Sequence, residues 1–317
     1  MMPLGWLYNS VVGLRNAMFD RQLLRARKLA WPVVSVGNIS VGGSGKTPFV
    51  IMLGQLLAEK GIWIDVLSRG YRRSTQGVLT VNAQGTPDEY GDEPLLIARK
   101  LRCPVIVGED RFEAGLQVEA DHAGARSNPM HLLDDGFQHR QLHRDFDIVL
   151  LNEEDLKGKL LPGGRLREPP NSLKRADALV VHSSFLPELI PQGDFKIWHV
   201  ERELEIPDVK LPVIAFCGIA RPQRFFSDLR QQGIDVRQEV VFRDHHRYTD
   251  SDVQRLCAAQ ARWAAARFVT TEKDAINLGS HLASLDPVVV KMRMTLVDSD
   301  QAVRFMLGTL AERRACQ

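Results

Sequence analysis

A glycine-rich loop constrains the fold of this chain more than any other feature of the sequence. In residues 40–47, three glycines allow backbone N–H groups to turn inward around an anion, and a lysine and a threonine end the loop. The ammonium group of Lys46 can reach the outer phosphates of a nucleotide, and the hydroxyl of Thr47 can ligate Mg²⁺. The sequence therefore predicts a phosphate-binding loop. Its expected nucleotide contacts are Val41, Gly42, Gly43, Ser44, Gly45, Lys46 and Thr47.

The segments that flank the loop are those of a strand–loop–helix unit. Residues 32–36 form a short β-branched run. Apolar residues recur at helical spacing directly after the loop, at Phe49, Leu53, Leu56 and Leu57. Ser40 stands where the usual motif has its first glycine, so a glycine-rich turn that merely joins a strand to a helix is the alternative interpretation. The flanking strand and helix favour the phosphate loop.

Short β-branched runs alternate with helical patterns along most of the chain. The runs expected to be strands include residues 63–67, 103–107, 130–134, 147–151 and 178–181. Such alternation is typical of α/β folds, so we predict a P-loop NTPase-like, doubly wound and mainly parallel sheet with a second, smaller α/β domain. The pattern loosens in residues 186–212. We therefore divide the chain into an N-terminal amphipathic helix in residues 1–30, a nucleotide-binding domain in residues 31–205 and a smaller C-terminal domain in residues 206–317.

Composition excludes several classes of protein. The formal net charge is only +2, so we expect no nucleic-acid partner. The four cysteines lie far apart, which argues against a zinc site or a disulfide framework and fits a reducing cytosol. No segment contains the roughly 18 uninterrupted apolar residues of a membrane span, and the N-terminus lacks the features of a signal peptide.

The N-terminal segment has the pattern of an amphipathic helix. Its apolar residues recur at helical spacing, at Leu4, Leu7, Val11, Leu14 and Met18. Its basic residues outnumber the single acid Asp20 and are Arg15, Arg21, Arg25, Arg27 and Lys28. This pattern is typical of a helix that lies in a membrane interface. A helix packed on the protein's own core would show the same spacing, so both interpretations stay open.

Two acidic residues, Asp92 and Glu93, begin a predicted helix after Gly91. Asp92 is well placed to cap that helix, and capping alone could explain its presence. Paired carboxylates beside a nucleotide site could instead hold Mg²⁺ or accept a proton from an attacking hydroxyl group. Spacing does not decide between a cap and a base.

Two further polar clusters follow predicted strands. Asp134 and Asp135 end an apolar run, which is the form of a Walker B element that orients Mg²⁺, although two acids after a strand are often only a turn. The Asp-His-His stretch in residues 244–246 could bind a metal or relay protons, or it could be a polar loop before the helix that begins near residue 250. Three arginines surround a glycine in residues 68–73 and could contact phosphate or be solvated.

Together these segments resemble the tetraacyldisaccharide 4′-kinases, the lipid A 4′-kinases of Gram-negative bacteria. The matching segments follow one another along nearly the whole chain, at residues 35–48, 67–73, 91–94, 133–139, 166–169, 244–246, 248–249 and 270–274. A phosphate loop is common by itself, whereas Asp-Asp-Gly-Phe-Gln-His combined with Asp-His-His is specific. Members of this family often have Ser or Thr at the position of Ser40.

The resemblance implies transfer of the γ-phosphoryl group of ATP to the 4′-hydroxyl of a tetraacylated glucosamine disaccharide 1-phosphate at the cytoplasmic face of the bacterial inner membrane. ATP and Mg²⁺ are the implied cofactors, and the acylated lipid and an anionic membrane surface are the implied partners, with no obligate protein partner evident. Asp92 matches the family's candidate base, assisted by either His245 or His246, with Lys46 on the phosphates. The expected metal ligands are Thr47, Asp134, Asp135 and Glu93. The side chains expected near the nucleotide or the head group are Tyr71, Arg72, Arg111, Gln138, His139, Arg167 and Glu168.

Two other functions share the phosphate loop. A membrane-associated partitioning ATPase of the MinD type needs a lysine where this chain has Val41. A nucleotide-gated binding module would use the acidic residues only to hold a metal. ATP consumption that depends on an acyl-disaccharide acceptor distinguishes the kinase from both.

Overall fold

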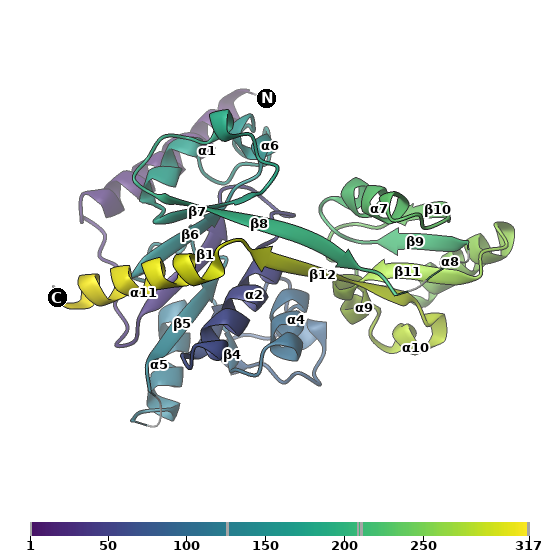
Figure 1. Cartoon of the computed structure of the whole chain (residues 1–317), viewed down its shortest axis with the longest axis horizontal. Helices are drawn as coiled ribbons and strands as arrows, with labels where there is room; N and C mark the ends of the chain where they lie inside the picture. The colour runs from purple at the N-terminus through teal and green to yellow at the C-terminus, as the bar shows by residue number, and fades with distance from the viewer. Residues whose placement is uncertain (1, 125–126, 208, 210–211, 316–317) are drawn as a thin grey trace.

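The protein consists of two lobes of unequal size joined by a pair of long strands (Figure 1). The structure is a computed structural model and describes residues 2–124, 127–207, 209 and 212–315. Within these residues, the strands of both lobes form one sheet in the order β10-β9-β11-β12-β8-β7-β6-β1-β5-β2-β4-β3. The predicted α/β architecture with a mainly parallel sheet is confirmed.

The larger lobe contains a parallel sheet covered by helices. Its strands are β1 (Val33–Asn38), β2 (Trp63–Ser68), β4 (Val105–Val107), β5 (Pro129–Asp134), β6 (Phe146–Leu150) and β7 (Ala178–His182), with β3 (Leu79–Thr80) antiparallel to β4 at the edge. Its helices are α1 (Met2–Asp20), α2 (Lys46–Glu59), α3 (Pro87–Tyr90), α4 (Asp92–Lys100), α5 (Arg111–Asp121) and α6 (Glu153–Leu156), with short 3-10 helices at Pro170–Arg175 and Pro187–Leu189. β1 lies between β5 and β6, so the phosphate loop after β1 and the acids after β5 meet at the carboxyl edge of the sheet.

The smaller lobe repeats the same alternation on a smaller scale. Its parallel strands are β9 (Val213–Cys217), β10 (Val236–Val241) and β11 (Arg267–Thr271). Its helices are α7 (Pro222–Gln231), α8 (Asp250–Arg262), α9 (Glu272–Leu278) and α10 (Leu282–Leu285), with a 3-10 turn at Gly279–His281. Aromatic side chains, among them Phe216, Phe242 and Tyr248, fill the core on one face of this sheet.

An antiparallel pair of strands makes the two lobes continuous. β8 (Lys196–Glu205) pairs with β7 of the larger lobe, and β12 (Val288–Leu296) pairs with β11 of the smaller lobe. β8 and β12 also pair with each other, from Lys291 opposite Glu205 to Leu296 opposite Val200. The chain therefore passes between the lobes twice through hydrogen-bonded strands.

The helix that follows β12 returns to the larger lobe. α11 (Ser299–Ala315) lies along that lobe in Figure 1, and its Val303, Met306 and Leu310 belong to the same hydrophobic core as Phe146 of β6. The division of the chain at residue 205 remains a proposal. It assigns α11 to the smaller domain, whereas the apolar side chains of α11 are buried in the larger lobe.

Helix α1 contacts the larger lobe through polar groups and leaves apolar side chains exposed. Asn16 donates to Oε2 of Glu168 at 2.8 Å, whereas Val11 and Leu14 are 58% and 65% exposed. Leu4 and Leu7 lie outside the residues whose side chains the structure describes. Within the described part of the chain, no helix combines the length and the apolarity that crossing a membrane requires.

A buried ionic cluster lies in the sheet of the larger lobe. His131 is completely buried, with Nδ1 2.8 Å from Oδ2 of Asp65 and Nε2 3.3 Å from Oε1 of Glu119. Its ring stacks on Trp31 with the centroids 5.1 Å apart. Burial alone would lower the pKa of His131, but the two carboxylates outweigh it and raise this pKa to about 9.

Candidate active site

The phosphate loop has the backbone conformation that its glycines predict. Gly42, Gly43 and Gly45 have φ of 67°, 66° and 86°, in the left-handed region that glycine adopts without strain. A Cβ at Gly42 would lie 2.8 Å from that of Ala220, and a Cβ at Gly43 would lie 2.9 Å from the side chain of Arg221. The loop therefore needs glycine both to turn and to admit the smaller lobe, which packs against it.

Lys46 begins α2 and points back toward the end of β1. Its Nζ donates to Oδ1 of Asn38 at 3.1 Å and lies 3.3 Å from Oδ1 of Asp135. The lysine thus lies beside Asp135, one of the two Walker B acids. The N-cap residue of α2 is Gly45, which has no side chain that could accept from the N–H groups of the first turn. These N–H groups can therefore bind an anion.

The two acids after β5 have different environments. Arg167 donates to both oxygens of Asp135 at 2.7 Å. Burial alone would raise the pKa of Asp135, but Lys46 and Arg167 hold it far below its usual value. Oδ2 of Asp134 accepts from Ser68 at 3.0 Å, and burial with the carboxylates of Glu93 and Asp135 raises the pKa of Asp134 to about 7. Asp135 therefore forms ion pairs with two cationic side chains, whereas Asp134 forms no ion pair with any residue that the structure describes.

The residues around Asp134 fit a magnesium ion held partly by a nucleotide. Oδ1 of Asp134 is buried and has no hydrogen-bond partner among the described residues. Thr47, at the start of α2, supplies a second oxygen donor. No three His, Cys, Asp or Glu side chains in the described ranges gather as a ligand cluster, so phosphate oxygens would have to complete the coordination, as is common for Mg²⁺. Of the other expected ligands, Asp135 is paired with Arg167 and Glu93 with Lys273.

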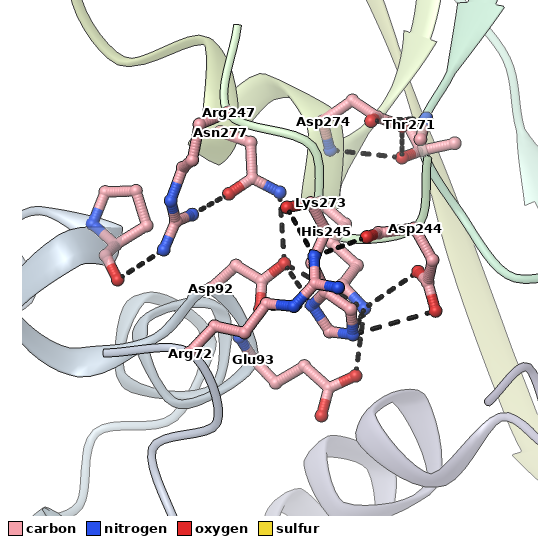
Figure 2. A network of polar contacts seen from close by, with 12 residues as sticks. Arg72, Asp92, Glu93, Asp244, His245, Arg247, Thr271, Lys273, Asp274 and Asn277 are labelled. Atoms are coloured by element: carbon pink, nitrogen blue, oxygen red, sulfur yellow. Dashed lines mark hydrogen bonds and ion pairs between the residues drawn. The ribbon is translucent and has the colours of Figure 1, made fainter. Parts of the chain in front are cut away.

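Asp92 and His245 meet across the two lobes (Figure 2). Nδ1 of His245 lies 2.9 Å from Oδ1 and 2.8 Å from Oδ2 of Asp92. The histidine has a φ of 58°, and Arg72 holds this turn by donating to the carbonyl oxygens of Asp244 at 2.7 Å and of His245 at 3.2 Å. Tyr71 packs edge-on against the imidazole with the ring centroids 5.3 Å apart. Two of the predicted substrate-binding residues therefore support the histidine.

Asp92 does not cap its helix in the way the sequence suggested. Gly91 occupies the N-cap position with a φ of 88°, and α4 begins at Asp92 itself. The carboxylate is 2% exposed and accepts from Asn277 at 3.0 Å and from the N–H of Glu93 at 2.9 Å, besides its contact with His245. Burial alone would raise the pKa of Asp92, but these donors and the charge of Lys273 hold it well below its ordinary value.

The adjacent histidine serves the smaller lobe. Nε2 of His246 lies 2.9 Å from Oδ2 of Asp252 in the first turn of α8, and its ring stacks on Phe242 with the centroids 4.8 Å apart. Thr249 caps the same helix. The structure thus distinguishes two histidines that the sequence could not, because only His245 contacts Asp92.

Lys273 is a site residue that our sequence analysis missed. Its Nζ lies 3.0 Å from Oε1 of Glu93 and 3.3 Å from Nε2 of His245. Burial alone would lower the pKa of Lys273, but the carboxylates of Glu93, Asp92 and Asp244 raise it above its ordinary value. The signal was its place in the Thr-Thr-Glu-Lys-Asp stretch of residues 270–274, which we used only as a family marker. Asp274 of that stretch is structural, since it accepts from Gly218, Tyr248 and Thr271.

A cavity of about 220 Å³ separates the lobes at this point. The phosphate loop forms one wall, and His245 and Lys273 form another. Apolar side chains line a further part, among them Leu204, Ile219, Phe225, Val290 and Met292. Arg202 of β8 reaches the loop and donates to the carbonyl oxygen of Ser44 at 2.9 Å. The cavity therefore combines an anion-binding loop, basic side chains and an apolar wall.

The remaining predicted residues form a second cluster beneath α1. Nε2 of Gln138 donates to Glu168 at 3.0 Å and to the carbonyl oxygen of Asn38 at 2.9 Å. Tyr8 donates to the carbonyl oxygen of Arg167 at 3.2 Å. These contacts connect α1 with the residues that hold Asp135.

Arg111 is buried near Asp134 and Asp135, and His139 is partly buried near Arg111. Arg111 donates to the carbonyl oxygen of Glu109 at 2.9 Å, and burial lowers its pKa. Burial and the charge of Arg111 lower the pKa of His139 to about 3, and its Nε2 has no hydrogen-bond partner among the described residues. His139 is therefore neutral at physiological pH.

The chain is similar to known proteins over nearly its whole length. A family model described as LpxK, tetraacyldisaccharide-1-P 4′-kinase, matches residues 1–311. A tetraacyldisaccharide 4′-kinase of Koribacter versatilis is 46% identical over 325 residues, covering 99% of this chain and 100% of that protein. The kinase of the same name from Aquifex aeolicus is 39% identical over 298 residues, covering 88% and 89%. The crystal structure of the "apo" form of LpxK from Aquifex aeolicus in complex with ATP superposes with a TM-score of 0.77 and 33% identity over 98% of each chain.

Proposed function

Because this chain belongs to the tetraacyldisaccharide-1-phosphate 4′-kinase family, we propose that it transfers the γ-phosphoryl group of ATP to the 4′-hydroxyl of a tetraacylated disaccharide 1-phosphate. The observation that carries this proposal is the contact between Asp92 and His245 beside the cavity that the phosphate loop lines. A proton acceptor and an anion-binding loop at one cavity are what phosphoryl transfer to an alcohol requires.

The phosphate loop supplies position and charge. The N–H groups of the loop and of the first turn of α2 face an anion, and Lys46 adds a positive charge at the outer phosphates. To bind the nucleotide, Lys46 must leave its ion pair with Asp135. Arg167 then remains as a cationic partner of Asp135. Preorganised donors of this kind stabilise the charge that develops on the transferred group.

His245 is the group that we propose to take the proton of the attacking hydroxyl. Asp92 matches the family's candidate base, but it is buried and already accepts several hydrogen bonds, which makes a carboxylate a weak base. His245 lines the cavity, so its Nε2 can reach a hydroxyl group there. Asp92 then orients the ring and stabilises its charged form, as the carboxylate of a catalytic triad does.

Magnesium is part of this proposal as a bound partner of ATP. Thr47 and Asp134 are the residues that would hold it, because both offer oxygen and Oδ1 of Asp134 lacks another partner among the described residues. When bound, Mg²⁺ neutralises charge on the β- and γ-phosphates. Arg167 keeps the neighbouring Asp135 paired.

The acceptor proposed here is a lipid, so the enzyme must work where that lipid is held. We propose that α1 lies at the cytoplasmic face of the inner membrane with Val11 and Leu14 toward the acyl chains. Their exposure and the basic residues near them support this placement. Arg27 is less available for head groups, because it forms ion pairs with Asp110 and Glu113 of the larger lobe.

Radiolabelled phosphate transfer from ATP tests the function. We expect label to appear in the lipid when tetraacyldisaccharide 1-phosphate is supplied in mixed micelles, and little ATP to be consumed without it. A partitioning ATPase of the MinD type would consume ATP without this acceptor, and a binding module would consume none. The full-length family match and Val41 in the loop disfavour the ATPase.

A further inference from the structure

The ammonium group of Lys273 contacts Nε2 of His245, the ring nitrogen that would accept the proton in the proposed reaction. Its Nζ lies 3.3 Å from Nε2 of His245, the ring nitrogen opposite the one that contacts Asp92 (Figure 2). The same Nζ lies 3.0 Å from Glu93, 3.9 Å from Asp92 and 3.8 Å from Asp244. Lys273 therefore connects α4 of the larger lobe with the loop between β10 and α8 of the smaller lobe, which carries His245.

This contact determines where the imidazole carries its proton. An ammonium group has three donors and no acceptor, so a hydrogen bond between Lys273 and Nε2 of His245 requires a neutral ring whose Nε2 accepts, although Oδ2 of Asp244 also lies 3.7 Å from that nitrogen. A ring nitrogen that accepts carries no hydrogen, and the proton therefore lies on Nδ1. That hydrogen points at Asp92, 2.8 Å away. Lys273 and Asp92 together select the tautomer in which Nε2 keeps its lone pair on the side of Lys273.

The same contact also blocks the proton acceptor. A hydroxyl group can donate to Nε2 only after the ammonium group has left that nitrogen. Lys273 and the phosphate loop line one cavity, so a bound triphosphate lies within the space that the lysine faces. A polyanion that enters this space attracts the ammonium group more strongly than the neutral Nε2 does, because the charge–charge interaction is the stronger of the two, and it competes for the lysine with the carboxylate of Glu93.

We propose that Lys273 is a positioning residue that selects the Nδ1-protonated form of His245 in the resting enzyme and passes from Nε2 to a phosphate of bound ATP. The base then becomes accessible only when the phosphoryl donor is in place. This inference rests on the proposed function, because it assigns a role at the same site.

The alternative is that Lys273 is only an ion pair that joins the two lobes. The chain offers a matched control for this possibility, since Lys100 of α4 forms an ion pair with Glu272 of α9, the residue next to Lys273. Lys100→Met removes a lysine–carboxylate contact between the same two helices without touching His245. An effect shared by Lys100→Met and Lys273→Met would be structural.

Nitrogen NMR of histidine-labelled protein tests the inference directly. The His245 signals are assigned by their loss in His245→Gln, and two-bond couplings from ring nitrogens to carbon-bound protons report the tautomer. In the wild type without nucleotide we expect a proton on Nδ1 and none on Nε2. Lys273→Met should give a mixture of tautomers, whereas Lys273→Arg, which also offers only donors, and Lys100→Met should keep the wild-type pattern. A wild-type ring protonated on Nε2 would overturn the proposal.

The second part of the proposal predicts a response to nucleotide. ATP added with a chelator should shift the Nε2 resonance of His245 in the wild type and in Lys100→Met, because the lysine leaves that nitrogen. The shift should be much smaller in Lys273→Met. Equal shifts in all three proteins would show that the lysine does not move between the two partners.

Steady-state kinetics provide a separate readout. Lys273→Met should lower kcat by roughly 10²-fold and raise KM for ATP, because both the orientation of the base and a phosphate contact are lost. Lys273→Arg should restore part of kcat, and Lys100→Met should leave both parameters near wild type. If label transfer to the lipid is absent in the wild type, the proposed function fails, but the NMR experiment still tests the role of Lys273. If transfer is present and Lys273→Met matches Lys100→Met in kcat, the inference alone fails.

Discussion

Nδ1 of His245 lies 2.8 Å from Oδ2 of Asp92, across 153 residues of sequence and between two lobes. His246, the next residue, contacts Asp252 of its own lobe instead. The two histidines of one short stretch therefore have different tasks, and each task predicts a different phenotype.

The first prediction compares the two histidines. His245→Ala should lower kcat by roughly 10²- to 10⁴-fold per folded molecule, because the ring serves the reaction, and it should also lower stability, because the buried Asp92 loses a partner. His246→Ala should cost about 1–2 kcal/mol of folding free energy, since a hydrogen bond and a stacked ring are lost, and should change the rate per folded molecule little. Label transfer and denaturant unfolding of both variants check this pair, and the reverse pattern would contradict the assignment.

Lys46→Ala tests the phosphate loop. The side chain contacts Asn38 and Asp135 and no apolar core, so the protein should fold, while turnover falls by roughly 10²- to 10³-fold through the lost charge at the outer phosphates. Phosphate transfer is measured alongside circular dichroism. A folded variant with near-normal turnover would refute the loop assignment.

Asp92→Asn should affect both rate and stability. An amide keeps an oxygen that could cap a helix, so a capping role would predict little change in stability. The structure alters that expectation, since the carboxylate accepts from His245 and Asn277. The NH₂ group of an asparagine at this position would face the N–H groups of these two residues, which are also donors. We expect a loss of about 1–3 kcal/mol of folding free energy together with a large fall in kcat. Unchanged thermal stability would argue against the buried network.

Local sequence patterns were sufficient to predict the α/β fold with its mainly parallel sheet, because each strand and helix depends on residues close together in the chain. The role of Asp92 could not be predicted in the same way. Its partners His245 and Asn277 come from the smaller lobe, and the contact between the lobes, which includes the packing of α9 against α4, brings them near. The cap interpretation failed for a local reason, since Gly91 already provides the backbone turn before the helix.

The role of Lys273 also depends on contacts between segments that are far apart in the sequence. The Thr-Thr-Glu-Lys-Asp stretch indicates the family but does not show that the lysine in the first turn of this helix has buried partners. The importance of this lysine arises from Glu93 and His245, which belong to two different segments. The interpretation of α1 remained open for a further reason, because amphipathic spacing is the same whether the apolar face meets a membrane or a core.

His131 predicts a pH dependence of stability. Its pKa is about 9 in the folded protein, against 6.5 as the ordinary value. The stabilisation is fully present below about pH 6.5 and is lost as the pH rises toward 9, because only the native state retains the proton in that interval. His131→Gln should flatten this part of the curve, which spans up to about 3 kcal/mol. Urea unfolding at several pH values measures the slope, and equal slopes in both proteins would refute the prediction.

The exposed apolar side chains of α1 predict membrane attachment. Val11→Ser combined with Leu14→Ser should release the protein from anionic vesicles without altering stability, since both side chains are exposed. Neutralising Arg21 and Arg25 should instead weaken binding and reduce its sensitivity to salt. Vesicle flotation at low and high salt separates the two effects, and unchanged flotation of the double serine variant would favour a helix that serves only the protein itself.

The return of α11 to the larger lobe has a consequence for biosynthesis. A ribosome completes β1, β5 and β6 early, but Val303 and Met306, which fill the core beside Phe146, emerge only after the whole smaller lobe has been made. The nucleotide lobe therefore cannot reach its native core while synthesis is under way, even though most of its residues are translated first. Nascent chains stalled before residue 299 should expose that core to chaperones and proteases. Once α11 has left the ribosome, it should pack on the larger lobe and bury the core.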